Sequence, residues 1–227
     1  MPLTPETWLS EFTANLTTAG SQSVPRVTHL ANGNILVAWV SGDNSGVGSP
    51  AGSDIIGQIF NPLGERIGVE FLVNAQSSGE NENDFDIVAL PGGGFVTVFE
   101  RLTASGFNDI LIHEHSATGT VVNDTSMFFD GNTNANPSGF DPRVAVNSSG
   151  IVLTVWRETE ASGESQIMAR SYDPSTDTRG TADNVIAFPG GNFTPDVAAL
   201  NNGNFVIVDS HDDAGDREIV IRIISVN

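Results

Sequence analysis

One pattern of 15 residues recurs four times along the chain, and this repetition limits the possible folds more than any other feature of the sequence. In Pro25–Trp39, a short apolar segment is followed by a turn that contains Asn32-Gly33 and by a second apolar segment. The other copies are Phe85–Phe99, Pro142–Trp156 and Pro195–Asp209. Two apolar runs joined by a glycine turn predict a β-hairpin. The anchor residues Val27, Ile87, Val144 and Val197 lie 60, 57 and 53 residues apart, a period typical of propellers and solenoids.

The first three repeats each contain two further candidate strands after the hairpin, and the last repeat contains one. In the first repeat these are Asp54–Phe60 and Val69–Val73, which are joined by a turn at Asn61–Gly64. Four antiparallel strands per repeat are typical of the blade of a β-propeller. The sequence therefore predicts an all-β, four-bladed β-propeller. We expect one domain over residues 1–227, with repeats at about 24–83, 84–140, 141–193 and 194–227.

The two ends of the chain have complementary strand patterns. The last repeat ends after its third strand, Glu218–Ile224, whereas Glu11–Asn15 near the N-terminus has the same pattern as Glu70–Asn74. We therefore expect residues 9–16 to complete the last blade as its fourth strand and to close the ring, which leaves only short edges exposed. An open solenoid is the alternative, and it leaves the N-terminal strand pattern unexplained.

Composition excludes several classes of function. The chain has 28 acidic and 9 basic residues and a formal net charge of −19, so it repels the phosphates of nucleic acids. It has no cysteine and therefore no disulfide or thiolate metal site. No long apolar segment predicts insertion into a membrane. Residues 1–8 lack the basic and apolar regions of a conventional signal peptide, so we expect any export to need another route or a removed segment.

The repeats resemble those of a family of large secreted proteins. The pattern Pro-x-Val-Ala-x-Leu-x-x-Gly-x-Phe-Val-Ile-Val of Pro195–Val208, together with Glu-Phe-x-Val-Asn of Glu70–Asn74, is similar to repeats of hemolysin-type, or RTX-associated, calcium-binding proteins and adhesins of marine and other proteobacteria. The resemblance covers roughly residues 9–224 and implies a secreted protein in a calcium-rich setting. The calcium-binding nonapeptide GGxGxDxUx of that family is absent, since Gly92–Gly94 is followed by Phe95 and Val96.

Charged residues directly precede the four anchor positions. Because side chains alternate along a strand, we expect these charged residues to face the central channel when the anchors face the blades. They are Arg26, Asp86, Arg143 and Asp196. Alternating arginine and aspartate side chains would either pair and fix the blades, or frame a pocket for a small anionic or hydroxyl-rich ligand.

The last repeat contains further candidate site residues. Asp209 stands where the other repeats have Trp39, Phe99 and Trp156, and a carboxylate at an aromatic position suggests a site, with His211 two residues further on. The following loop offers Asp212, Asp213 and Asp216 as oxygen ligands for calcium, and a solvated loop that binds no metal is the alternative. His113 and His115 lie two apart on a predicted strand, a spacing that can chelate zinc, but an exposed strand face explains them better.

No catalytic motif is present, neither a Ser-His-Asp order nor a Gly-x-Ser-x-Gly turn nor a phosphate-binding loop. This absence favours a non-catalytic extracellular binding or adhesion module, whose loops on one propeller face bind a glycan, calcium or a cell-surface protein. One alternative is a small enzyme, a lyase or hydrolase, that uses carboxylates at the channel end and His211. Another is a structural or assembly subunit with an apolar patch on one edge.

Overall fold

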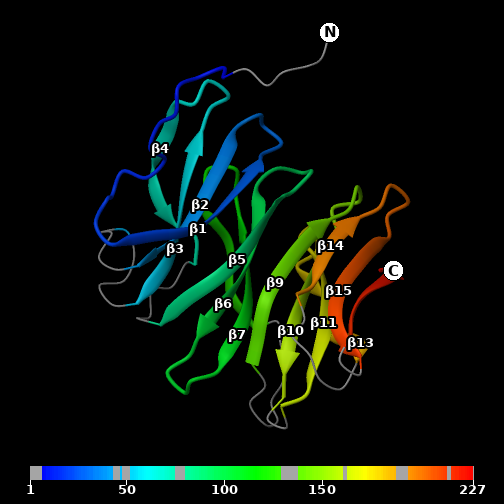
Figure 1. Ribbon diagram of the computed structural model, residues 1–227. Helices are drawn as coiled ribbons and strands as arrows, with labels where there is room; N and C mark the ends of the chain where they lie inside the picture. Colours follow the sequence, from blue (N-terminus) through cyan, green and yellow to red (C-terminus); the bar gives the residue numbers. More distant parts are fainter. Residues whose placement is uncertain are drawn as a thin grey trace.

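The computed structural model describes residues 7–42, 47, 52–74, 80–128, 138–160, 163–187, 194–213 and 216–226. Within this part of the chain there are sixteen strands, arranged as four consecutive antiparallel sheets that we call blades 1 to 4 (Figure 1). None of the described residues forms a helix that could cross a membrane.

Blade 1 contains β1 (Ser21–His29), β2 (Ile35–Gly42), β3 (Ser53–Phe60) and β4 (Arg66–Leu72). Blade 2 contains β5 (Asn81–Ala89), β6 (Phe95–Leu102), β7 (Asn108–His115) and β8 (Val121–Phe128). Blade 3 contains β9 (Ser138–Val146), β10 (Val152–Thr159), β11 (Ser165–Asp173), β12 (Thr178–Arg179) and β13 (Asp183–Ala187). Blade 4 contains β14 (Asp196–Ala199), β15 (Phe205–Asp213) and β16 (Asp216–Ile224).

The predicted all-β propeller built from hairpin repeats is confirmed. The first two strands of every blade pair as an antiparallel hairpin, and the third strand pairs with the second. In every blade the turn between the first two strands contains a glycine with positive φ, such as Gly33 at 87° and Gly203 at 86°. Glycine adopts this conformation without steric cost, and the recurring glycine turns in the sequence are therefore a reliable sign of the hairpins.

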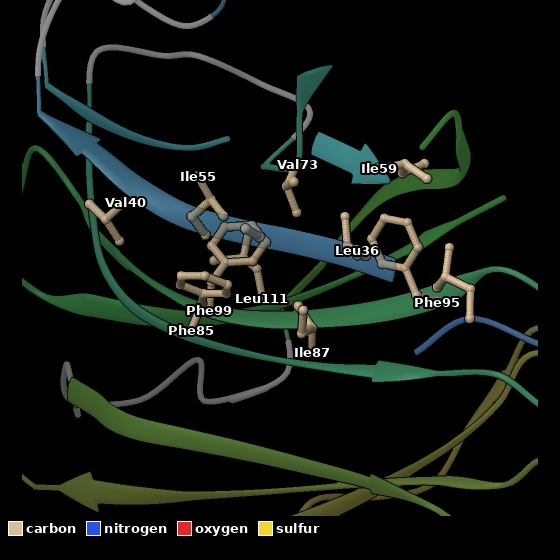
Figure 2. Packing of buried hydrophobic residues seen from close by; sticks show 12 residues of the cluster. Leu36, Val40, Ile55, Ile59, Val73, Phe85, Ile87, Phe95, Phe99 and Leu111 are labelled. Carbon is tan, nitrogen blue, oxygen red and sulfur yellow. The ribbon is translucent and has the colours of Figure 1, made fainter. Parts of the chain in front are cut away.

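Among the described residues, buried apolar side chains form three clusters, each between two neighbouring blades. The first joins blades 1 and 2 and includes Leu36, Ile55, Phe85, Phe95 and Phe99 (Figure 2). The second joins blades 2 and 3 around Trp156 and Tyr172, and the third joins blades 3 and 4 around Phe205 and Ile207. Burial of these faces between blades is the main apolar stabilisation of a repeat fold, since one blade cannot bury its own faces.

The predicted closure of the ring by residues 9–16 is wrong for the described residues. This segment lies beside blade 1, where the Phe12 ring is 5.6 Å from the Phe60 ring and the Leu16 N–H donates to Glu70 Oε1. Arg66 Nη2 also donates to the carbonyl oxygen of Thr13. These contacts hold the segment at blade 1, and in the described part of blade 4 no strand pairs with the outer edge of β16.

Gly94, in the turn between β5 and β6, tests how closely two backbone segments approach each other at this turn. It has a φ of 79°, and a Cβ atom added to it would lie 2.1 Å from the backbone oxygen of His115. At its neighbour Gly93, with a φ of 102°, an added Cβ would meet nothing within 4 Å. We expect Gly93→Ala to cost about 1 kcal/mol from strain alone. Gly94→Ala should cost about 3 kcal/mol or more, because the backbone must also move. Urea unfolding of both variants checks this, and equal losses would contradict it.

A buried acidic pair, Asp54 and Glu82, lies between blades 1 and 2. Asn74 Nδ2 donates to Asp54 Oδ1 at 2.9 Å, and both carboxyl groups are nearly inaccessible to solvent. Burial, reinforced by the negative charge of Asp54, raises the pKa of Glu82 to about 8. The folded protein therefore favours protonated Glu82 more strongly than the unfolded chain does.

The buried pair predicts a pH dependence of stability. Because the pKa of Glu82 is raised on folding, its contribution is fully present below about pH 4.5 and is lost as the pH rises through about 8. We expect Glu82→Gln to flatten the decline of the unfolding free energy between these limits. Urea unfolding of the wild type and the variant at several pH values measures the difference, and parallel curves would contradict the prediction.

Candidate functional site

The inner strands of blades 1 to 3 each contain a β-bulge at the same place. The register shifts lie between Ser23 and Arg26 in β1, between Glu82 and Phe85 in β5, and opposite Val155 to Arg157 in β9. A bulge increases the local twist of a strand and turns side chains away from simple alternation. Bulges are common beside active sites, and these three lie at the same end of adjacent inner strands.

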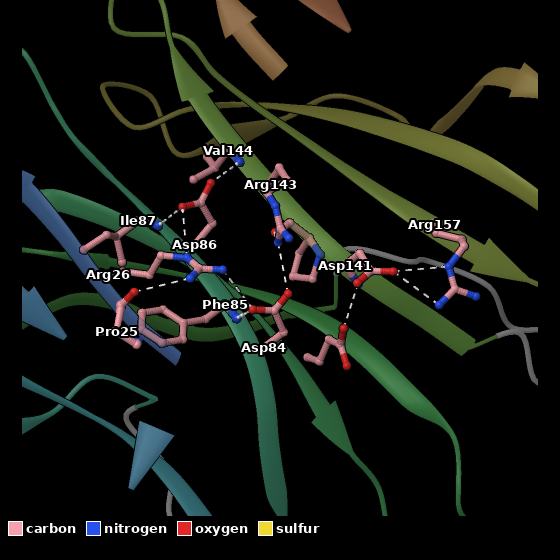
Figure 3. Close-up of polar contacts among 12 residues, drawn as sticks. Pro25, Arg26, Asp84, Phe85, Asp86, Ile87, Asp141, Arg143, Val144 and Arg157 are labelled. Carbon is pink, nitrogen blue, oxygen red and sulfur yellow. Dashed lines mark hydrogen bonds and ion pairs between the residues drawn. The ribbon is translucent and has the colours of Figure 1, made fainter. Parts of the chain in front are cut away.

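Three carboxyl groups meet at the bulges of blades 2 and 3. Asp84 of β5, Glu100 of β6 and Asp141 of β9 each offer an oxygen atom, and these oxygens all lie within 4.8 Å of one another. We call these residues the carboxylate cluster. The backbone N–H of Asp141 donates to Glu100 Oε1 at 2.7 Å (Figure 3). Asp141 has a φ of 53°, an uncommon conformation for a residue other than glycine and one that is concentrated at functional sites.

Arginine side chains surround the carboxylate cluster. Asp84 bridges two of them, since its Oδ1 is 3.1 Å from Arg26 Nη2 and its Oδ2 is 3.0 Å from Arg143 Nη1 (Figure 3). Asp141 Oδ2 lies 3.3 Å from Arg157 Nη2. The arginines compensate the charges of both aspartates and fix their orientation.

Glu100 differs from the two aspartates in its environment. No arginine forms a described ion pair with it, and burial raises its pKa to about 7 despite the hydrogen bond from the Asp141 N–H. The negative charges of Asp84 and Asp141 raise the pKa further. Glu100 therefore carries a proton at mildly acidic pH, whereas the neighbouring aspartates are paired with arginines. Such a difference in surroundings lets one carboxyl group act as an acid and another as a base.

The carboxylate cluster is also, among the described residues, the one group of ligating side chains spaced closely enough to hold a metal ion. Its aspartates already accept from Arg26, Arg143 and Arg157. Three nearby guanidinium groups oppose the binding of a divalent cation, and the donor set therefore suits acid–base chemistry better than metal binding.

The structure brings together three of the four predicted channel residues. Arg26 and Arg143 meet at Asp84, and Asp86 lies beside them, with its Oδ1 3.8 Å from Arg26 Nε. Burial raises the pKa of Asp86, which accepts from the backbone N–H of Val144. Asp196 is not part of this group, since it is exposed on β14 and accepts from the N–H of Val197. The predicted role of these residues in ligand binding stays a prediction.

The candidate residues of the last blade are only partly described. Asp209 is buried on β15, and its Oδ1 accepts from the N–H of Thr194 at 3.1 Å. The side chains of His211, Asp212 and Asp213 lie outside the described residues. Asp216 is exposed at the start of β16. Calcium binding by this loop therefore stays a prediction.

The two histidines of β7 are core residues, and the predicted exposed strand face is wrong. His115 stacks on Phe95 with ring centroids 4.6 Å apart, and His113 contacts the edge of Phe99. Burial lowers the pKa of His115 to about 4, which keeps its ring neutral. Their apolar surroundings indicate packing, not a site.

Sequence reasoning missed all three members of the carboxylate cluster. Asp84 and Asp141 stand two residues before Asp86 and Arg143, and they occupy the same position of the repeat. The corresponding residues of the other repeats are Val24 and Thr194. A carboxylate at one repeat position in two adjacent blades was the signal that could have identified them.

A separate pocket of about 330 Å³ lies at the opposite end of the inner strands, between the hairpin turns of blades 2 and 3. Leu90, Ser149 and Asp173 line it together with Glu114, whose Oε2 accepts from the hydroxyl group of Tyr172 at 2.7 Å. The described residues that line this pocket include no arginine and no group of three carboxylates. The carboxylate cluster is therefore the better candidate for chemistry.

Comparison with known proteins identifies the fold class. No family model matches the chain, and no curated protein matches it. The endo-arabinase of Bacteroides thetaiotaomicron VPI-5482 is 14% identical with a TM-score of 0.58, over 95% of this chain and 80% of that chain. The α-L-arabinanase of Penicillium chrysogenum is 13% identical with a TM-score of 0.59, over 90% of this chain and 63% of that one. The Hadza microbial sialidase Hz136 is 11% identical with a TM-score of 0.65, over 88% and 44%. At such identities the likeness shows a β-propeller fold.

The comparisons correct two predictions. The prediction of a non-catalytic adhesion module is wrong, because the solved structures that share this fold include an endo-arabinase, a family-43 glycoside hydrolase and sialidases. They favour the enzyme alternative. The repeat propeller is supported, but the resemblance to hemolysin-type repeats is not, since no family model matches the chain.

Proposed function

We propose that this chain is a glycoside hydrolase that uses the carboxylate cluster as its acid and base. The observation that carries the proposal is the approach of three carboxyl oxygens to within 4.8 Å of one another, with Glu100 protonated at mildly acidic pH and Asp84 and Asp141 paired with arginines. The solved propellers named as arabinases, arabinanases and sialidases support this choice of reaction.

The roles follow from the surroundings of each group. Most glycoside hydrolases use one carboxylic acid that protonates the leaving oxygen and one carboxylate that either activates water or attacks the sugar carbon. Glu100 is the acid, since burial holds its proton. Asp141 pairs with a single arginine, Arg157, and is assigned the role of the second carboxylate. Asp84 pairs with both Arg26 and Arg143 and orients them.

The short spacing of the carboxyl groups favours a two-step reaction with retention of configuration, for which a separation of about 5 Å is typical. Asp141 attacks the anomeric carbon as the glycosidic C–O bond breaks, and Glu100 gives its proton to the leaving oxygen. Water then attacks the glycosyl ester on Asp141 and gives a proton back to the Glu100 carboxylate. The free sugar and the starting form of the enzyme result.

The substrate of this proposal is an extracellular glycan. Arg26 and Arg143 lie at the carboxylate cluster, where both pair with Asp84, and guanidinium groups are suited to donate hydrogen bonds to sugar hydroxyl groups or to a sugar carboxylate. Arabinan, galactan and a sialylated oligosaccharide are the first substrates to try, because the solved propellers include arabinanases, sialidases and a putative exo-β-1,3-galactanase.

The experiment that tests the proposal is a hydrolysis screen with these glycans. We expect the wild-type protein to release free sugar from at least one of them, and Asp141→Asn to release none above the buffer blank. Asp173→Asn is the matched control, because Asp173 is a half-buried aspartate that lines the separate pocket and lies outside the carboxylate cluster, so this variant should keep full activity. Absence of release from every glycan would overturn the proposal, and so would full activity of Asp141→Asn.

A further inference from the structure

The last blade leaves an apolar row of side chains uncovered. Ile219, Ile221 and Ile223 alternate along β16 and are 73%, 64% and 62% exposed. The residues between them point the other way, and Val220 and Ile224 pack against the cluster that joins blades 3 and 4. Three adjacent exposed isoleucines on one side of a strand mark an interaction surface. We call them the trailing face.

The repeat shows what such a face contacts elsewhere in the chain. Asp209 of blade 4 and Phe99 of blade 2 occupy the same position of the repeat. Asp209 pairs with Val220, and Phe99 pairs with Leu111, so Val220 and Leu111 are equivalent. Ile219 and Ile221 therefore correspond to Ile110 and Ile112 of blade 2. Those two residues are completely buried in the cluster with Trp156 and Val144 of blade 3. The trailing face is thus a surface of the kind that the following blade covers.

Blade 1 presents the opposite kind of surface. Its anchor Val27 is 68% exposed, although the anchors Ile87 and Val144 are buried against the preceding blade. The N-terminal segment lies on the same side of blade 1. Phe12 of this segment packs on Phe60, which pairs with Ile35 of β2. Ile35 lies two residues before Val37, the residue of β2 that pairs with Val27, so these side chains share one face of the sheet. Four apolar side chains of this segment are exposed, namely Trp8, Leu9, Phe12 and Leu16. We call these four side chains and Val27 the leading face.

The two faces lie at the two ends of the row of blades, and no described apolar cluster joins blade 4 to blade 1 (Figure 1). We propose that the trailing face of one copy of this chain binds the leading face of a second copy. The contact would add a fourth apolar cluster to the three that already join blades. It is a head-to-tail contact, which closes into a ring or continues from copy to copy.

The proposal is independent of the proposed hydrolase function, because neither face includes a member of the carboxylate cluster. It also predicts a salt dependence. Each copy has a formal charge of −19, so two copies repel each other at low ionic strength, whereas the contact itself is apolar. We therefore expect added salt to strengthen association, which is the opposite of what an ionic contact would show.

Sedimentation equilibrium over a wide concentration range tests the proposal. We expect the wild-type chain to associate into multiples of its 23.9 kDa mass. Ile219→Asp with Ile221→Asp, which changes the trailing face, should weaken association at least a hundredfold, as loss of central apolar contacts does. Trp8→Ser with Phe12→Ser, which changes the leading face, should have the same effect. Val122→Asp, at an exposed valine of β8 outside both faces, should leave association unchanged.

Mixing the two double variants decides the geometry of the contact. Each variant keeps one intact face, so a head-to-tail contact predicts that the mixture forms a complex of one copy of each and nothing larger. A wild-type chain that stays monomeric at every concentration and salt level overturns the proposal. Self-association of the leading-face variant alone also overturns it, because the trailing faces would then bind each other. Unchanged thermal unfolding of each double variant excludes misfolding as the cause of lost association.

Discussion

Replacing Glu100 by glutamine is expected to lower kcat for glycoside hydrolysis by about 10²- to 10⁴-fold, the usual contribution of a general acid. Glutamine keeps the size of the side chain and can still accept the hydrogen bond from the Asp141 N–H, but it has no proton to give to the leaving oxygen. The wild-type kcat/KM should fall as the pH rises through about 7, where Glu100 loses its proton. This alkaline decline should disappear in the residual activity of Glu100→Gln.

Glu158→Gln is the matched control for this prediction. Glu158 is a buried glutamate of β10 whose pKa is also raised by burial, but its Oε1 accepts from Gln166 and it lies outside the carboxylate cluster. We expect its substitution to leave kcat and the pH profile unchanged. Equal losses of activity in the two variants would point to a general effect of buried glutamates and would contradict the role of Glu100.

Trp156→Ala should lower the free energy of unfolding by about 3–5 kcal/mol, the range for truncation of a large buried aromatic side chain. Trp156 is fully buried in the cluster between blades 2 and 3, and a Cβ atom added at Gly139 would lie only 3.3 Å from its ring. The surroundings are β-strands from two blades, which cannot collapse into the cavity without moving the interface. Urea unfolding followed by fluorescence or circular dichroism measures the loss.

The control for the tryptophan is an exposed apolar residue. Val122 of β8 is 61% exposed, and Val122→Ala should change the unfolding free energy by less than about 0.5 kcal/mol. A loss below about 1 kcal/mol for Trp156→Ala would mean that blades 2 and 3 do not share a packed interface. It would remove the basis for bringing Asp84 and Asp141 together.

The fold could be predicted from the sequence because its strongest constraints are local. Glycine at a turn of positive φ, as at Gly33 and Gly203, and apolar strands on both sides recur in every repeat. The placement of residues 9–16 could not be predicted in this way. Their pattern identifies a candidate strand, but the contacts of Phe12 with Phe60 and of Leu16 with Glu70 decide which blade they join.

The site was partly predictable for a similar reason. Simple alternation from the anchors correctly placed Arg26, Asp86 and Arg143 near one another. It was not extended to Asp84 and Asp141, which stand two residues before Asp86 and Arg143, in the bulged parts of β5 and β9. The same alternation failed for Asp196 of blade 4. The charged residues of the other inner strands gather between blades 2 and 3, which is the side of blade 3 that faces away from blade 4.

The preference for a non-catalytic function was based on the absence of a catalytic motif. Short motifs mark sites whose residues are close in sequence, whereas the members of the carboxylate cluster come from three strands and are separated by 16 and 41 residues. Only the folded structure brings them together. A function that depends on such a cluster leaves no contiguous pattern in a single sequence.

The most direct test of the central claim is a time course of sugar release by the wild-type protein and by a variant that carries Asp84→Asn, Glu100→Gln and Asp141→Asn. Both proteins are incubated with the same arabinan, galactan and sialylated oligosaccharide at mildly acidic pH, after thermal unfolding has shown that the variant is folded. We expect steady release from at least one glycan by the wild type and none by the variant. Equal release by both proteins, or release by neither, would contradict it.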